Sequence, residues 1–390
     1  MLRRISLPVQ LLIVIACAFL FGTMLPQVVV TWMYTASVVF KDLLTFILPF
    51  IILAFVLDGI LSFKKNAPLI LLIMLAMIFV SNALVTMLDY VIMRWVSCAI
   101  ASKGDAAIIA AHDLIHPAFT LGLPTLLRTE YALICAIALG LFFTFVRVPK
   151  FERSSHHFKR TIEHILNWVV IPFLPLYVFG FLLKMRFEGT FILLMQNYSG
   201  TFFLIVATQI CYLIWMYALA TRFSLRNMLD AIKNALPSYL TGFSTMSSAV
   251  TVPVSVECAY KNTHNRPLAM VAMPIMANVH LLGDSIGIPM LAMVTMLLFT
   301  GSLPDFAQYA SFVFYFCTAM FAVSGIPGGA ILVMTPILVS QLNFSAEMIG
   351  VITALFLLMD SFGTAANVMG DGALVIMVDK LLKKLGLHNE

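Results

Sequence analysis

The chain alternates long apolar runs with short polar connections over its first 225 residues. A helix needs about 20 predominantly apolar residues to cross the hydrocarbon core of a bilayer. Six segments of the chain offer runs of this kind, and they lie near 7–30, 35–62, 67–97, 129–147, 163–185 and 190–220. The pattern therefore predicts six membrane-spanning helices in this part of the chain.

The pattern changes beyond residue 225, where serine, threonine, glycine and proline break the apolar runs. The stretch at about 235–258 has a polar centre at Ser244–Pro253, and the stretch at about 304–343 is centred on Ser324–Gly329. Backbone that bends inside a membrane needs polar groups of this kind to satisfy its freed hydrogen-bonding groups. We therefore predict two re-entrant hairpins. A kinked spanning helix is the simpler alternative for either stretch taken alone.

Together these segments predict an all-α polytopic membrane protein with eight transmembrane helices and two re-entrant helical hairpins. Residues 1–225 hold six of the helices, and residues 226–390 hold the hairpins, a seventh helix at about 267–300 and an eighth at about 346–380. Interrupted segments followed by long apolar helices point to a binding site at the membrane midplane in secondary transporters. The layout thus favours a transporter.

Lysine and arginine residues collect in alternate connections, which orients the chain because cytoplasmic connections carry the excess of basic residues. If the six N-terminal spans simply alternate, the basic clusters fall on one side. They include Arg3, Arg4, Lys64, Lys65, Arg147, Lys150, Arg222, Arg226, Lys380 and Lys384. We therefore predict a multi-pass protein of the cell membrane (inner or plasma membrane) with both termini in the cytoplasm.

The composition agrees with a membrane location. Apolar residues make up 62% of the chain and charged residues 11%, and the mean hydropathy is +1.01. Soluble chains carry about 25% charged residues, so this chain has too little polar surface to cover a water-facing body. Its net charge of +5 comes from clusters beside apolar runs. Because no basic face forms, a nucleic-acid partner is excluded, and membrane lipid is the expected surrounding.

One face of the last predicted helix carries its strong polar groups, which are Asp360, Thr364, Asn367 and Asp371. At 100° per residue these four positions project within about a 60° arc. An ionised aspartate at the membrane centre costs about 2.5–3.5 kcal/mol, whereas an interhelical hydrogen bond contributes only about 0.6 kcal/mol. The carboxylates therefore need partners of another kind. Bound cations, a substrate amine or N–H groups of the hairpin tips are the candidates.

Each predicted hairpin tip places a hydroxyl shortly before a proline, with Thr251 before Pro253 and Ser324 before Pro327. This arrangement is typical of the start of a helix, and helix N-termini attract carboxylate groups. The tips therefore favour an anionic group of a ligand. Hard cations such as Na⁺ prefer carboxylate, amide and carbonyl oxygens, which the polar face of the last helix supplies.

Three segments resemble the dicarboxylate/amino acid:cation symporter family, which has the glutamate-transporter fold. Ser247–Pro253 is similar to the serine-rich first hairpin of that family, and Gly325–Gly328 is similar to the Gly-Val-Pro-Gly of its second hairpin. Asp360–Asp371 follows the last-helix pattern D-x-x-R-T-x-x-N-V-x-G-D. The resemblance is strong over about 226–385 and is limited to the layout of the spans before that.

The resemblance implies a secondary active transporter that carries an amino acid or a dicarboxylate with Na⁺ or H⁺ as coupling ion, by an elevator-type alternating-access mechanism. It implies no catalytic residue, no metal centre and no other cofactor. It also implies a homotrimer whose helices one, two, four and five form a scaffold. The implied substrate-binding residues are Asp360, Gly363, Thr364, Ser247, Ser248, Gly325, Ile326, Pro327 and Gly328. The implied cation-binding residues are Asn367, Asp371, Gly283, His280, Ser81 and Asn82.

Two departures from the family pattern bear on the substrate and on the ion. Gly363 replaces the arginine that binds a second carboxylate, so a neutral amino acid fits better than a dicarboxylate. The family motif Asn-Met-Asp-Gly-Thr of the seventh helix corresponds to His280–Asp284 here, and only its glycine survives. Leu282 removes a carboxylate, which predicts a weakened or absent sodium site. Asp284 is a candidate to compensate for this loss, but it lies two positions further, about 200° around a regular helix, and faces elsewhere unless that helix is unwound.

His280 leaves two interpretations open. A histidine among buried aspartates is able to titrate near neutral pH and to carry a proton. A neutral histidine with one hydrogen bond in the core is the alternative. Na⁺ is the favoured coupling ion, and H⁺ is the second choice.

Two other functional classes are compatible with parts of the sequence. A non-transporting membrane sensor or scaffold with the same fold agrees with the altered seventh-helix motif. An intramembrane aspartyl protease would use two membrane aspartates as a general acid–base pair. Against a protease, Val368 and Leu281 occupy the positions where such enzymes have a glycine, and neither aspartate follows a tyrosine.

Further polar residues lie outside these motifs. His112 and His116 are four residues apart in a predicted outer loop, where metal binding is one interpretation and a solvated loop is the simpler one. Asp42, Asp58 and Asp89 lie near the ends or in the interior of predicted spans. Packing and gating are both open roles for these three aspartates.

Overall fold

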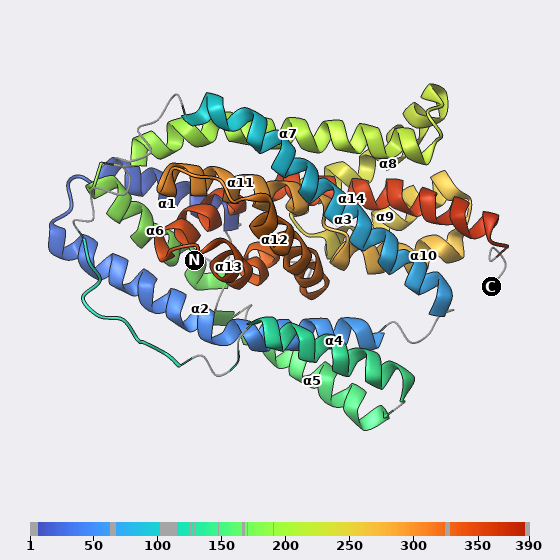
Figure 1. Cartoon of the computed structure of the whole chain (residues 1–390), viewed down its shortest axis with the longest axis horizontal. Coiled ribbons are helices and arrows are strands. Elements are labelled where there is room, and N and C mark those ends of the chain that lie inside the picture. The colour runs from blue at the N-terminus through green and yellow to red at the C-terminus, as the bar shows by residue number, and fades with distance from the viewer. Residues whose placement is uncertain are drawn as a thin grey trace.

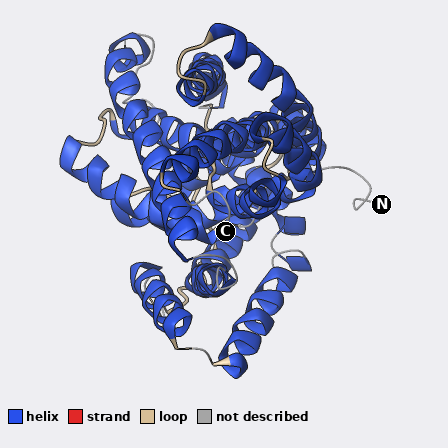
Figure 2. Cartoon of the chain, turned by 90° about the vertical axis from the view of Figure 1, so that its right-hand side faces the viewer, coloured by secondary structure: helices blue, strands red, loops and turns tan. Residues whose placement is uncertain are grey.

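The computed structural model describes most of the chain as helices joined by short connections (Figure 1). The described residues are 7–62, 68–101, 115–124, 127, 129–146, 148–165, 168–169, 171–189, 191–323 and 328–386. Within these ranges the regular elements are all helical and no strand is present (Figure 2). The predicted all-α class is thus confirmed for this part of the chain.

The described part of the N-terminal half contains the helices α1 to α7. They are α1 (Leu7–Phe21), α2 (Gln27–Ser62), α3 (Pro68–Ala101), α4 (Thr129–Phe145), α5 (Pro149–Ile165), α6 (Ile171–Phe187) and α7 (Phe191–Ala220). The predicted boundary at 30–35 is wrong, because the chain turns at about 22–26 instead. Pro26 precedes α2, and a proline with its preset φ is well suited to the start of a helix.

Helix α5 occupies a connection in which no element was predicted. Its charged residues lie on one face, whereas Phe151, Phe158 and Ile162 are partly or fully buried. The ring of Phe151 stacks on Phe143 of α4 with centroids 3.7 Å apart. The amphipathic spacing of a helix explains why this polar segment still packs on its neighbours.

The packing of α5 on α2 involves Asp58. Lys159 Nζ of α5 lies 3.0 Å from Asp58 Oδ2 of α2. Of the two roles left open for this aspartate, the structure therefore shows packing. Asp42 likewise accepts a hydrogen bond from the backbone N–H of Leu121 at 3.1 Å, which ties part of a connecting segment to α2.

The described part of the C-terminal half contains the helices α8 to α14 and a short 3₁₀ helix. They are α8 (Leu225–Thr245), α9 (Ser248–Thr263), α10 (Arg266–Val279), α11 (Leu282–Thr300), α12 (Phe306–Ala319), η5 (Met320–Ala322), α13 (Gly329–Leu342) and α14 (Ala346–Lys384). α8 packs on α9, and α12 packs on α13. These two helix pairs occupy the stretches with broken apolar runs.

The turn between α8 and α9 departs from the prediction about its cap. Met246 takes a left-handed conformation with φ 53°, and the extended Ser247 caps α9 by accepting the N–H of Val250 at 3.3 Å. Thr251 lies inside the first turn and donates its hydroxyl to the Ser247 carbonyl at 2.9 Å. The half-helix therefore begins four residues before the predicted position. Ser247 has the extended backbone that an N-cap requires, and Thr251 has not.

The predicted seventh helix is divided in two. α10 ends at Val279 and α11 begins at Leu282, while His280 and Leu281 have φ values of −102° and −107° outside the helical geometry. A break inside a buried segment frees backbone N–H and carbonyl groups, which must then find partners in other elements. This break determines the geometry of the polar site described below.

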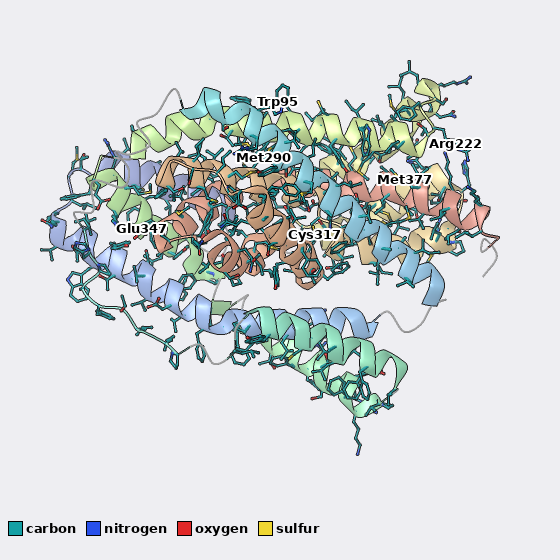
Figure 3. All side chains as sticks on the ribbon, viewed as in Figure 1. Trp95, Arg222, Met290, Cys317, Glu347 and Met377 are labelled. Carbon is teal, nitrogen blue, oxygen red and sulfur yellow. The ribbon has the colours of Figure 1, made fainter. Side chains whose placement is uncertain are left out.

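The core surrounds α11, which packs against α3, α7 and α14 (Figure 1). Met290 near the middle of α11 is fully buried, whereas Trp95 on the outer side of α3 is 84% exposed (Figure 3). Exposed aromatic and aliphatic side chains are spread over the outer helices, as they are on a surface that faces lipid.

Four segments among the described residues are long and apolar enough to cross a membrane. They are Leu72–Ser97, Tyr198–Ala220, Arg266–Thr300 and Ala346–Lys384. Two shorter apolar helices are Gln27–Phe40 and Gly329–Leu342. Several predicted spans thus coincide with apolar helices.

Candidate functional site

The polar face of α14 meets the break between α10 and α11, and Asn367 is the centre of this contact. Its Oδ1 accepts the backbone N–H groups of Gly283 at 2.6 Å and of Asp284 at 3.4 Å, and its Nδ2 donates to Asp284 Oδ2 at 3.0 Å. The two N–H groups belong to the first turn of α11, where a helix offers them no partner of its own. One amide therefore satisfies the start of a broken helix.

His280 lies in the break and joins three elements. Its Nδ1 is 2.8 Å from Asp371 Oδ1 of α14, and its Nε2 is 3.0 Å from Ser81 Oγ of α3. His280 and Asp371 are both fully buried. Asp371 thus has an imidazole as its neighbour at the position where the resemblance implies a cation.

Asn82 holds the other side of the break. Its Nδ2 donates to the carbonyl of Val279 at 3.1 Å, which is the last residue of α10. Two adjacent residues of α3, Ser81 and Asn82, therefore bind His280 in the break and Val279 directly before it. The structure brings all the implied cation-binding residues together around this point.

Asp360 forms a second cluster, one to two turns before Asn367 on α14. Its Oδ2 accepts the N–H of Gly328 at 2.9 Å, and its Oδ1 accepts the hydroxyl of Thr364 at 3.3 Å. Gly328 precedes α13 with φ 72°, a conformation that favours glycine. The start of α13 is thus bound to the carboxylate of Asp360. The implied tip residues Gly325, Ile326 and Pro327 lie outside the described residues.

At Gly283 and Gly363 the backbones of α11 and α14 lie close together. A Cβ added to Gly283 would collide with the backbone of Gly363, and a Cβ added to Gly363 would lie 3.0 Å from Asp284 Oδ1. The two missing side chains let the helices approach. As a result, a carboxylate lies beside position 363, where the family pattern has an arginine.

Asp284 was expected to face elsewhere only if this helix is regular. The helix is broken at His280 and Leu281, and this break turns the start of α11 toward α14, so Asp284 faces the site. Asp284 and Asp360 are also close enough to interact electrostatically. Two acidic side chains accordingly share one buried site.

The turn between α8 and α9 reaches α14 near the same site. A Cβ added to Gly242 in the last turn of α8 would lie 3.2 Å from the Thr364 carbonyl. Ser247 and Ser248, the implied substrate ligands of this turn, are both buried. The turn approaches α14 on the side of Thr364, while the start of α13 approaches at Asp360.

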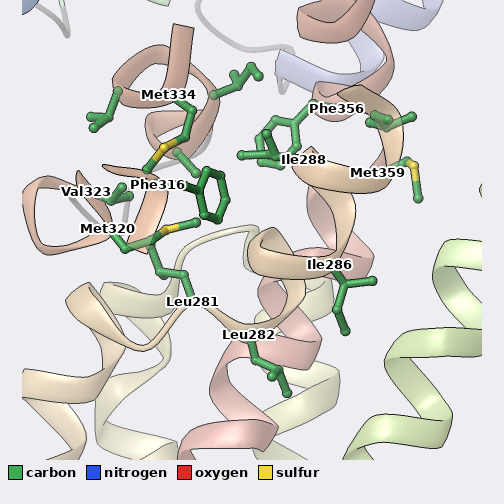
Figure 4. Close-up of a cluster of buried hydrophobic side chains, with 14 of the residues drawn as sticks. Leu281, Leu282, Ile286, Ile288, Phe316, Met320, Val323, Met334, Phe356 and Met359 are labelled. Carbon is green, nitrogen blue, oxygen red and sulfur yellow. The ribbon is translucent and has the colours of Figure 1, made fainter. Parts of the chain in front are cut away.

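Apolar side chains border the break on the side of α12 and α13. Leu281 points toward Met320 of η5, and Phe316 and Met334 lie in the same cluster (Figure 4). Leu282 points away from Met320 (Figure 4). Because this cluster excludes water, the neighbouring polar groups interact in a medium of low dielectric, which strengthens both attraction and repulsion.

The site leaves several polar atoms without a hydrogen-bond partner, and all are oxygens. They are Asn82 Oδ1, Asp284 Oδ1 and Asp371 Oδ2. Among the described residues no lysine or arginine forms an ion pair with Asp284, Asp360 or Asp371. Buried acceptors without donors are costly, and hard cations bind to oxygen sets of this composition. The arrangement is suited to binding a cation or a positively charged group of a ligand.

Two residues that the sequence reasoning missed also contact the site. Gln209 of α7 donates its Nε2 to the Gly283 carbonyl at 3.1 Å, and Tyr217 of α7 donates its hydroxyl to the Met369 carbonyl at 3.0 Å. The available signal was the polar pair Thr208 and Gln209 in an otherwise apolar run. Of the two loop histidines, His116 is exposed, and His112 lies outside the described residues.

The order of these polar groups agrees with a sequence comparison. The profile of the sodium:dicarboxylate symporter family matches residues 7–381. The chain belongs to this family. Its members are transporters and not enzymes, so the interpretation as an intramembrane protease is excluded. Family membership and the apolar helices together make the chain a multi-pass membrane protein.

Individual relatives are distant. An uncharacterized symporter of Haemophilus influenzae is 26% identical over 55% of this chain and 49% of its own length. Excitatory amino acid transporter 5 of Mus musculus is 27% identical over 40% of this chain and 27% of its own. The serine/threonine transporter SstT of Acinetobacter baylyi is 23% identical over 98% of this chain and 99% of its own. The match thus spans half or less of the first two relatives and nearly all of the third.

Proposed function

We propose that this protein is a secondary active transporter that carries an amino acid across the cell membrane together with a cation. The observation that supports the proposal is the buried set of oxygen acceptors on α14 and α11, with no lysine or arginine of the described residues to neutralise it. Membership in the sodium:dicarboxylate symporter family supports the same function.

The bond between Asp360 and Gly328 suggests how an amino acid binds. The carboxylate of Asp360 suits an α-ammonium group, and the N-terminus of α13 suits an α-carboxylate. In the structure these two groups bind each other at 2.9 Å. We propose that an amino acid replaces this bond, with its ammonium on Asp360 and its carboxylate at the starts of α13 and α9. A ligand that bridges both groups favours the closed arrangement by differential affinity.

The surroundings of Gly363 support a neutral amino acid over a dicarboxylate. A second carboxylate at this position would meet Asp284 Oδ1 instead of an arginine. Like charges in one desolvated site cost several kcal/mol, by our estimate about 2–4 kcal/mol. A hydroxyl or amide side chain is instead able to donate a hydrogen bond to Asp284. The relative that matches nearly the full length is named a serine/threonine transporter, which agrees with this choice.

Na⁺ is the proposed coupling ion, and H⁺ is the alternative. Asn82 Oδ1 and Asp371 Oδ2 are unpartnered oxygens that suit Na⁺. Asn367 Oδ1 binds two backbone N–H groups, and His280 occupies one oxygen of Asp371, so at least one sodium site of the family is weakened here.

The wider architecture remains a proposal built on the resemblance. We propose eight spans with α8–α9 and α12–α13 as re-entrant hairpins, and both termini in the cytoplasm. Residues 1–225 would supply most of the scaffold of a homotrimer, and residues 226–390 would move as an elevator-type core. The helix pairs and their position against α14 support this division.

Uptake into proteoliposomes tests the proposed function. The purified protein is reconstituted, and labelled serine, threonine, alanine, aspartate, glutamate and succinate are offered under an imposed Na⁺ gradient or an imposed H⁺ gradient. We expect uptake of a neutral amino acid that requires the Na⁺ gradient. Uptake that follows only the H⁺ gradient would show that H⁺ and not Na⁺ is the coupling ion. Preferential uptake of a dicarboxylate would show that the substrate is not a neutral amino acid. If no compound enters under either gradient, the non-transporting sensor becomes the better interpretation.

A further inference from the structure

Asp89 of α3 is a buried carboxylate that the transport site does not use. Its side chain is fully buried, and neither of its oxygens has a hydrogen-bond partner. An ionised aspartate within a membrane-spanning helix costs about 2.5–3.5 kcal/mol even on the lenient insertion scale. The exposed Arg94 follows on another part of α3 and packs over the ring of Tyr90 instead. Among the described residues Asp89 therefore has no permanent counter-charge.

Asp89 belongs to a polar face of α3 that points at α11. Asn82, Thr86 and Asp89 project within about a 60° arc of a regular helix. The contacts between Asn82 and Val279 and between Thr86 and Ser285 advance together along both segments, so α3 and α10–α11 run in the same direction. Asp89 then lies about 10 Å along α3 from Asn82, away from His280 and Asp371.

Further oxygens lie on the stretch of α11 that faces this part of α3. Ser285 Oγ is buried without a partner. The Ser285 carbonyl accepts the hydroxyl of Thr86 at 3.2 Å, and it is free to do so because Pro289, four residues later, has no N–H to donate. Helical side chains lean toward the N-terminus, which brings the carboxylate of Asp89 back toward Thr86 and Ser285.

A tyrosine of α12 encloses the same space. Tyr309 is fully buried, donates its hydroxyl to the Thr86 carbonyl at 2.8 Å, and interacts electrostatically with Asp89. Its ring packs on Tyr90 with centroids 4.9 Å apart. Thr86, one turn before Asp89 on α3, is thus hydrogen-bonded to both Ser285 and Tyr309, so their oxygens and the Asp89 carboxylate belong to one polar cluster. Among the described residues neither oxygen of Asp89 has a hydrogen-bond donor.

We propose that Asp89, Thr86, Ser285 and Tyr309 form a sodium site between α3, α11 and α12, separate from the site on α14. One carboxylate with neutral oxygens suits a monovalent hard cation, whose charge it balances. A proton would also neutralise Asp89, and the experiment below distinguishes it from Na⁺. No group of three His, Cys, Asp or Glu side chains gathers in the described residues, so a multi-carboxylate or thiolate metal site is not the pattern here.

The experiment measures the thermal unfolding midpoint of the purified full-length protein against Na⁺ concentration, with choline keeping the ionic strength constant. Asp89→Asn keeps the side-chain volume and removes the charge. We expect this variant to need about 10-fold more Na⁺ for the half-maximal rise, the effect of losing one hydrogen-bonded charge. Asp230→Asn, on the exposed face of α8, is the matched control and should respond as the wild type does.

Two further variants separate this site from the site on α14 and guard against misfolding. Asp371→Asn should keep a residual Na⁺ response that disappears in the double variant with Asp89→Asn. Ser285→Ala retains the carboxylate and should weaken the response by less than Asp89→Asn does.

An Asp89→Asn response equal to that of the wild type would overturn the proposal, and so would the loss of the entire response in Asp371→Asn alone. A rise that follows acidification and not Na⁺, and that Asp89→Asn abolishes, would assign a proton to Asp89 and would likewise refute the sodium site.

Discussion

Acidic side chains in two regions of the molecule are neutralised in different ways. Along α2, Asp58 near the C-terminal end lies 3.0 Å from Lys159 Nζ of α5, and near the other end Glu347 of α14, which accepts the hydroxyl of Tyr34, lies 3.5 Å from Lys184 Nζ. Around α11 and the middle of α14, Asp284, Asp360 and Asp371 have an amide, a hydroxyl, one backbone N–H and an imidazole as partners.

In one region the carboxylates have a permanent counter-charge, and in the other a bound cation or ammonium group is able to supply it and leave again. A lysine is a fixed counter-charge that holds two helices together. An amide or a backbone N–H carries no net charge, so the carboxylate still attracts a cation or an ammonium group. The first region is therefore suited to packing and the second to binding. Substitutions in the two regions should accordingly have different effects on transport.

The largest effect is expected for Asp360→Asn. The amide cannot pair with an ammonium group, and removing one partner of a buried ion pair costs about 3–5 kcal/mol, which corresponds to at least about 100-fold in substrate affinity. Uptake of the preferred amino acid should disappear at unchanged membrane expression. Asp58→Asn is the matched control in the other region and should retain most of the uptake. Normal uptake by Asp360→Asn would remove this residue from the site.

A smaller effect, in selectivity, is expected for Asp284→Asn. The substitution removes the negative charge beside Gly363 and keeps the hydrogen bond to Asn367 available. Inhibition of neutral amino-acid uptake by a dicarboxylate should improve by at least about 10-fold, since relief of like-charge repulsion in a desolvated site is worth more than about 1.4 kcal/mol. The inhibition constants of aspartate and succinate measure the change. Unchanged constants would show that Asp284 does not face the substrate side chain.

For His280→Asn we expect an effect of similar or smaller size, and it concerns the Na⁺ requirement of uptake. The imidazole now occupies Asp371 Oδ1 at 2.8 Å, and the shorter amide offers an oxygen to a cation instead. The Na⁺ concentration for half-maximal uptake should fall by about 3- to 10-fold, the value of one hydrogen bond to a charged group. Asp230→Asn, on the exposed face of α8, is the control. A higher Na⁺ requirement in His280→Asn would contradict this view of the site.

The smallest effect on transport is expected for Lys184→Met. It removes the partner of Glu347 and a contact of the ammonium group with the ring of Tyr34, 4.8 Å away. Glu347 keeps the hydroxyl of Tyr34 at 2.6 Å, but the buried side chain of Glu188, 4.0 Å from Lys184 Nζ, also loses this partner, so the loss of stability should be about 3–5 kcal/mol. Thermal unfolding measures this loss, and uptake should stay within about twofold of the wild type. Loss of uptake without loss of stability would erase the distinction between the two regions.

The residues of the site were predictable from the sequence because helical spacing places Asp360, Thr364, Asn367 and Asp371 on one face of a helix. The apolar runs likewise predicted most helices and the broken C-terminal stretches. Two local signals were too weak to use. The break at His280 and Leu281 follows Pro274 by several residues and contains neither glycine nor proline, so it depends on partners from α3 and α14.

The second weak signal concerns amphipathic and polar segments outside the motifs. α5 carries many charges, and its apolar face becomes meaningful only when α2 and α4 are in place. The face of Asn82, Thr86 and Asp89 has the same spacing as that of Asp360, Thr364 and Asn367, yet its partners come from α11 and α12. Spacing reveals a polar face, whereas tertiary contacts decide what neutralises it.

Equilibrium binding of the transported amino acid to the purified protein tests most directly whether a bound amino acid and a bound cation neutralise the carboxylates of α14. Calorimetric titration of the wild type and of Asp360→Asn, each with Na⁺ or with choline, gives the affinities. The account predicts binding by the wild type that Na⁺ tightens by at least about 5-fold, the usual lower limit of coupling between two sites, and no binding heat in Asp360→Asn. Equal affinity of the two proteins would contradict it.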